Sequence, residues 1–262
     1  MPVNIALMGS TGSERSERRF EMTSGKPIAG ALSVLVAGFA LAGCGGAGET
    51  NRKDAAAGGK SSESAALPQG SEPVDLKPAD FTTKIDNAYW PMSPGSKWVY
   101  SEADTGGKKE KVVVEVTDRT KVIANGIEAR VIRDTVSEKG VPVEVTDDWY
   151  AQDKAGNIWY LGEYVTNYEN GKVVDHSGSF EAGVDGAQAG VALPANPEPG
   201  MSYRQEYYKG VAEDKAAVIT VGVEQVQVPF GYFRKGILMT RDLVPLEPKV
   251  QSTRSGSNPD HG

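Results

Sequence analysis

The chain from residue 81 to residue 248 alternates short apolar runs with turn sequences, which predicts consecutive β-strands. Runs rich in β-branched and aromatic residues occupy 111–117, 127–136, 141–152, 158–168, 172–180, 216–228 and 232–244. Asn125-Gly126, Asp153–Asn157 and Asn170-Gly171 separate several of them, and such sequences favour tight hairpin turns. No segment of this region combines a helical apolar period with capping residues.

These runs predict an all-β domain over residues 79–249, with about 8–10 antiparallel strands. Strand twist accumulates in a meander of this size, and an open sheet edge favours aggregation. We therefore expect one strongly curved sheet or an incomplete barrel, with a β-sandwich as the alternative.

One stretch inside this domain lacks the strand pattern. Residues 181–201 hold four glycines and three prolines and show no alternation. Connections this long are usually functional loops, lids or linkers. The sequence leaves open whether the segment is a lid or an ordinary crossover.

The N-terminal pattern differs and predicts an export signal over residues 1–43. Arg18, Arg19 and Lys26 precede an apolar run over 28–42, which is shorter than the roughly 20 residues of a bilayer span. Met22 begins a compact signal, so we expect translation to start there. The run ends in Leu41-Ala42-Gly43-Cys44, which resembles the bacterial lipobox. This resemblance implies that the Cys44 thiol is diacylated and becomes the N-terminus of the mature protein.

The two segments that flank the predicted β domain have sequences that indicate no folded structure. Residues 44–78 carry the lipidated cysteine and then mainly Gly, Ala, Ser and charged residues, which is typical of a flexible linker. Residues 250–262 have the composition of a disordered tail, where a curved sheet would be better closed by another apolar strand. We therefore expect a chain that is either truncated at this end or ends out of frame.

The composition of the chain restricts the classes of partner and of functional site that we expect. The 262 residues carry a formal net charge of −7, which disfavours nucleic acid as a partner. One cysteine and two histidines argue against internal disulfides, zinc fingers and iron–sulfur sites. We expect no cofactor, and no catalytic motif supports an enzyme.

The turn sequences also predict a register for the strands at 141–152 and 158–168. A three-residue loop at 154–156 sets Asp153 opposite Asn157 and Tyr150 opposite Tyr160. Alternation then places Trp149, Ala151, Trp159, Leu161 and Val165 on a core face. The other face carries the candidate ligand-binding residues Tyr150, Gln152, Tyr160 and Tyr164, together with Tyr168.

Tyrosine rings offer an apolar body and a polar tip, which suits an amphiphilic ligand. Tyrosines also favour strands for packing reasons alone, so the pattern leaves both interpretations open.

The same registers yield a candidate metal or acid–base site. They set Asp147 opposite Glu163 and place His176 diagonal to Glu163, whereas Val165 faces His176 and Glu163 faces Gly178. Facing carboxylates repel unless a cation or proton lies between them. These positions lie near strand ends, where charges are commonly solvated, and a one-residue slip would separate them.

The aromatic sequences of this region carry a second resemblance. Tyr89-Trp90-Pro91, Trp98-Val99-Tyr100 and 148–153 with Trp159-Tyr160 are similar to a bacterial secreted domain family without an established activity. This resemblance implies a fold and an extracytoplasmic location only. We therefore expect a lipid-anchored protein of the bacterial cell envelope that binds or carries a small amphiphilic or aromatic ligand. The alternative is a surface-displayed module that docks to another envelope protein.

Overall fold

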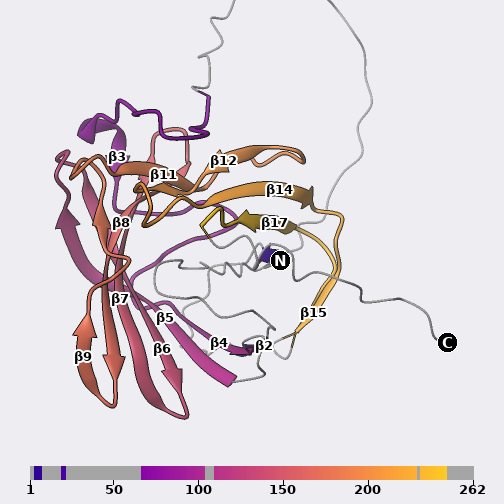
Figure 1. The fold of residues 1–262 in the computed structure, drawn as a ribbon. Coiled ribbons are helices and arrows are strands. Elements are labelled where there is room, and N and C mark those ends of the chain that lie inside the picture. The colour runs from indigo at the N-terminus through magenta and orange to yellow at the C-terminus, as the bar shows by residue number, and fades with distance from the viewer. Residues whose placement is uncertain (1–2, 8–18, 22–65, 104–108, 229–230, 247–262) are drawn as a thin grey trace, which may run out of the picture.

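The computed structural model describes residues 3–7, 19–21, 66–103, 109–228 and 231–246 (Figure 1). Strands dominate these ranges, and the single 3-10 helix η1 (Pro78–Asp80) is the helix among them. No helix within them is long and apolar enough to cross a membrane. Cys44, the apolar run at 28–42 and the expected tail at 250–262 all lie outside the described residues.

The larger sheet has eleven strands and curls strongly (Figure 1). Its hydrogen-bonded order is β13 (Glu206–Tyr207), β11 (Gln188–Leu193), β8 (Ile158–Glu169), β7 (Val141–Asp153), β6 (Glu128–Glu138), β5 (Lys109–Val122), β4 (Lys97–Ala103) and β2 (Arg19–Glu21). Off this path, β9 (Lys172–Asp175) and β10 (Phe180–Glu181) pair with β8, and β3 (Phe81–Thr82) pairs with β7. All these pairs are antiparallel except β2 with β4. The predicted all-β class and strongly curved, incompletely closed sheet are confirmed.

A smaller sheet faces part of the larger one. It contains β1 (Val3–Leu7), β17 (Ile237–Leu243), β14 (Lys215–Val221) and β12 (Ser202–Arg204) in that order. A separate ribbon joins β15 (Val226–Val228) and β16 (Gly231–Phe233). The expected continuous strands at 216–228 and 232–244 are therefore each broken in two, at turns that contain Gly222 and Gly236 with positive φ.

The buried core cluster contains residues of both sheets. Its aromatic side chains form a row: Trp90 packs edge-on against Tyr150, Tyr150 stacks on Tyr160 with ring centroids 4.9 Å apart, and Tyr160 meets Phe180 edge-on. Val218, Ile237 and Leu238 of the smaller sheet belong to the same buried cluster. Both sheets thus share one core.

The β7–β8 hairpin follows the predicted register only near its turn. Tyr150 pairs with Tyr160 and Ala151 with Trp159, as the three-residue loop predicts. Beyond them β8 has one residue more than β7, with Gly162 at a φ of 122°, and the register shifts. Asp148, not Asp147, therefore lies opposite Glu163, and Asp147 lies opposite Tyr164. The expected pair of Asp147 and Glu163 is wrong because of this β-bulge.

The next hairpin shows the same behaviour. Asn170 and Gly171 both have positive φ, and Glu169 pairs with Lys172 as expected for a two-residue turn. Two residues further along, the pairing shifts, and Phe180 rather than Gly178 lies opposite Glu163. A turn sequence therefore fixes the register only as far as the first bulge.

The segment 181–201, expected to lack strands, contains β11. Gly190 and Val191 of β11 pair with Tyr160 and Trp159 of β8. Small residues allow this packing, because a side chain at Gly190 would collide with the backbone of Gln205. Residues 188–193 are thus an integral part of the sheet, and this part of the segment is neither a lid nor a plain crossover.

The chain before η1 packs against the domain. Arg204, which is buried, donates hydrogen bonds to the backbone oxygens of Gly70 and Glu72 and to that of Ala189 in β11. Its own backbone nitrogen donates to the oxygen of Pro68. Residues 67–78, which the sequence assigns to a flexible linker, thus contribute to the packed domain.

Candidate functional site

A pocket of about 590 Å³ lies on the face of the larger sheet that carries Asp147 and Trp149, opposite the face that carries Asp148 and Tyr150. It is lined by residues of five strands: Arg119, Thr120, Lys121, Val131, Asp147, Trp149, Tyr164 and Glu181. We call it the Trp149 pocket. It combines aromatic and aliphatic walls with two cations and two carboxylates, so it suits a ligand with both apolar and polar parts.

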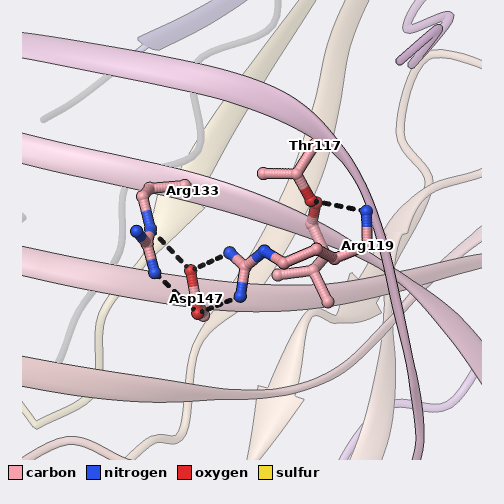
Figure 2. Close-up of polar contacts among 5 residues, drawn as sticks. Thr117, Arg119, Arg133 and Asp147 are labelled. Atoms are coloured by element: carbon pink, nitrogen blue, oxygen red, sulfur yellow. Dashed lines mark hydrogen bonds and ion pairs between the residues drawn. The ribbon is translucent and has the colours of Figure 1, made fainter. Parts of the chain in front are cut away.

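A bulge in β5 brings Arg119 to this pocket. Between Val116, which pairs with Ile132, and Thr120, which pairs with Arg130, β5 has two residues more than β6. The Thr117 hydroxyl holds the bulge by donating to the Val131 oxygen at 2.6 Å and accepting from the Arg119 backbone nitrogen at 3.2 Å. The Arg119 side chain consequently reaches Asp147 on β7, two strands away (Figure 2).

Asp147 accepts hydrogen bonds from two guanidinium groups. Arg119 donates from Nη1 and Nη2 at 2.9 and 2.8 Å, and Arg133 donates from Nε and Nη2 at 2.9 and 3.0 Å. The two arginines approach the carboxylate from opposite sides (Figure 2). Partial burial raises the pKa of Asp147, but the bonds from Arg119 and Arg133 outweigh it and hold the pKa below its ordinary value.

Lys121 occupies another part of the pocket. Its ammonium lies 4.0 Å from the centroid of the Trp149 ring, within the range of a cation–π contact, and 2.6 Å from the Glu181 carboxylate. Glu181 also accepts a hydrogen bond from the backbone nitrogen of Ala124. Lys121 is therefore charge-paired and fixed over the indole.

Tyr164 forms an exposed wall of the pocket. Its side chain is 49% exposed and stacks on the His176 ring, with centroids 4.7 Å apart. His176 Nδ1 lies 2.7 Å from the Val165 oxygen, so this nitrogen carries the proton in the neutral ring. Nε2 is then free to accept from the Tyr164 hydroxyl at 3.2 Å.

The predicted ligand-binding residues do not lie on one wall. Tyr150 and Tyr160 are 1% and 4% exposed and belong to the core. Gln152 accepts hydrogen bonds from the backbone nitrogens of Asp86 and Asn87 and thereby holds the chain before β4. The bulge at Gly162 turns Tyr164 to the opposite face, so the expected grouping of the four residues is wrong. Of the four, only Tyr164 lines the pocket.

The predicted metal candidates are likewise separated. Asp147 is bound to two arginines on the pocket face, Glu163 is buried on the core face, and His176 packs on Tyr164. Within the described part of the chain, no three or more His, Cys, Asp and Glu side chains are grouped to hold a metal ion.

Sequence reasoning missed Arg119, Lys121 and Trp149 as pocket residues. The alternation predicts a core position for Trp149, which is indeed mostly buried, but its ring also lines the pocket. Lys121 and Arg119 have the alternation of a surface strand and carry no motif. The run Thr117-Asp118-Arg119-Thr120, which interrupts the valine-rich part of β5, was the one available signal.

The core face contains an unexpected group of buried acids. Asp148 and Glu163 lie on paired positions of β7 and β8, and Glu206 of β13 is close enough to influence both. Burial raises the pKa of all three well above the ordinary values, and neighbouring carboxylates raise it further. The Tyr160 hydroxyl donates to Asp148 Oδ1 at 2.8 Å. Burial and the neighbouring carboxylates therefore favour the protonated form of these three groups over the charged form.

Comparison with known proteins adds no relative to this geometry. No family model, no curated protein and no solved structure matches the chain. The resemblances to the lipobox and to a bacterial secreted domain family remain predictions from the residues quoted for them.

Proposed function

We propose that the protein is a lipid-anchored, non-catalytic domain of the bacterial cell envelope that binds a small amphiphilic or aromatic ligand in the Trp149 pocket. The observation that carries the binding proposal is the pocket itself, where Val131, Trp149 and Tyr164 lie beside Arg119 and Lys121. Its volume of about 590 Å³ falls within the ordinary range of small-molecule sites. The envelope location rests on the sequence around Cys44.

Binding of 8-anilinonaphthalene-1-sulfonate tests the proposal, because this probe is aromatic, anionic and fluorescent in apolar surroundings. We expect saturable binding to one site on the full chain. In the Tyr164→Ser variant the affinity should fall about tenfold, since the loss of an aromatic contact costs about 0.5–1.5 kcal/mol beyond the lost area.

Tyr168→Ser is the matched control, because Tyr168 is a partly exposed tyrosine of the same strand that does not line the pocket. Its affinity should equal that of the wild type. Equal binding by the wild type and both variants would place the probe elsewhere and refute the pocket.

Docking to another envelope protein is the second candidate, and β9 favours it. All four residues of β9 are exposed, including Val173 and Val174, and among the described strands β9 pairs with β8 alone. An edge strand of this kind can accept a strand from a partner. Absence of any saturable probe site in the wild type would favour this second function.

A further inference from the structure

The charges around the Trp149 pocket are unequally distributed, and this bears on the class of ligand. One carboxylate, Asp147, is shared by two guanidinium groups, whereas Lys121 has Glu181 as its own partner. The group of three at Asp147 therefore retains one positive charge, and Asp118 is a further acid that acts on Arg119. The whole chain, in contrast, carries a net charge of −7.

Arg119 presents this excess charge to the pocket. It lines the pocket and its side chain is 46% exposed, whereas Arg133 binds the same carboxylate without lining the pocket. A guanidinium has five N–H donors, and the bonds to Asp147 use two of those of Arg119. Donors therefore remain on Arg119 for an anionic oxygen.

The pocket disfavours a cationic ligand for a separate reason. The Trp149 ring offers the best cation–π surface of the pocket, and Lys121 already lies over it at 4.0 Å. A ligand cation would have to displace Lys121 from both the ring and Glu181. The apolar contacts left to a ligand are those with Val131, Tyr164 and the remaining edge of Trp149.

We infer that the ligand is a small aromatic anion, whose ring contacts Trp149 and Tyr164 and whose carboxylate or sulfonate oxygens accept hydrogen bonds from Arg119. This inference rests on the proposed function of the pocket and specifies the charge of its ligand. Recognition depends on the local charge, since the net charge of the chain would by itself attract cations.

Three naphthalenes of similar size and different charge provide the test: 2-naphthoate, 2-naphthalenemethanol and 2-naphthylmethylamine. Their affinities for the full chain are measured by calorimetry at pH 7 and low ionic strength. We expect 2-naphthoate to bind at least tenfold more tightly than the alcohol, and the amine to bind most weakly. Failure of all three to bind would refute the proposed function. Equal binding, or preference for the amine, would leave a binding pocket and overturn the inference.

Two arginine variants locate the charge that matters. Arg119→Gln should weaken 2-naphthoate binding about tenfold and leave binding of the alcohol unchanged. Arg133→Gln likewise removes one positive charge and one guanidinium partner of Asp147, but it removes no pocket contact. The affinity for 2-naphthoate should therefore fall less than about threefold. Equal losses in both variants would show that distant charge, not contact with Arg119, selects the anion. Thermal unfolding of each variant confirms that the comparison concerns folded protein.

Discussion

At the scale of single residues, Asp147 and Asp148 show how one strand separates two environments. Successive side chains of a strand point to opposite faces. Asp147 accordingly meets Arg119 and Arg133 on the pocket face, whereas Asp148 is buried beside Glu163 and the Tyr160 hydroxyl. Neighbouring and chemically identical side chains thus have pKa values shifted in opposite directions.

Gly162 is the residue on which this separation depends. Its φ of 122° is rarely adopted by other residues, and a Cβ at this position would lie 2.3 Å from the Phe180 oxygen. Gly162→Ala should therefore lower the free energy of unfolding by about 3 kcal/mol or more, as measured by urea denaturation.

Gly140→Ala is the control for the backbone conformation alone. Gly140 also has a positive φ, of 84°, but a Cβ there meets no atom within 4 Å. Its substitution should cost about 1–2 kcal/mol. Equal costs for the two variants would mean that the close approach of Phe180 does not constrain the bulge.

At the scale of strands, β7, β8 and β13 together bury a group of acids. The raised pKa values of Asp148, Glu163 and Glu206 mean that these groups bind protons more tightly in the folded chain than in the unfolded chain. The other carboxyl and phenol groups that influence them are Asp134, Glu144, Asp147, Asp214, Asp242 and Tyr160.

Stability should consequently decrease from acidic to alkaline pH. The contribution of these acids is complete below the ordinary pKa values of 3.8 and 4.5 and is lost as the pH rises through their raised values. Asp147, with its lowered pKa, contributes in the opposite sense, and its contribution is lost only below pH 3.8. We expect a higher Tm at pH 5 than at pH 8, measured at constant ionic strength.

The variants Asp148→Asn and Asp147→Asn distinguish the two faces at pH 8. Asp148→Asn keeps an acceptor for Tyr160 and removes a buried ionisable group, so Tm should rise by roughly 2–4 °C per kcal/mol gained. Asp147→Asn removes the charge that both arginines bind and should cost about 1 kcal/mol, because those arginines are nearly half exposed. A higher Tm at pH 8 than at pH 5 in the wild type would contradict the burial of ionisable acids.

The strands also show how far the sequence predicts this fold and its site. Apolar alternation and the Asn-Gly and Asp153–Asn157 turns predict β5 to β8 and the pairing of Tyr150 with Tyr160. The later register depends on Gly162. A sequence does not distinguish a glycine that must adopt an unusual φ from any other glycine. β11 is not predicted for a related reason. Gly190 is required because the backbone of Gln205, from elsewhere in the chain, approaches it closely. The pocket is not predicted because the β5 bulge brings the Arg119 side chain to Asp147 on β7, two strands away.

At the scale of the whole molecule, the N-terminal strands are peripheral to the topology. β1 pairs with β17 and β2 pairs with β4, so each lies at an edge of its sheet. Residues 1–43 contribute to no other strand pair of the described part of the chain. The fold is thus compatible with the proposed cleavage before Cys44.

The proposed anchor has a specific test because the chain has one cysteine. An alkyne-labelled palmitate fed to cells that express the full chain should label the protein, since two or more acyl chains are needed for lasting attachment. Cys44→Ser should abolish the label, because no other thiol remains, and should leave the chain at its unprocessed length. Cys44→Ser should bind 2-naphthoate like the wild type, since the Trp149 pocket lies entirely within the β domain. Labelling that persists in Cys44→Ser would refute lipidation at this residue. Loss of the label in a Cys44→Ser chain of the same length as the wild type would show that cleavage does not depend on acylation.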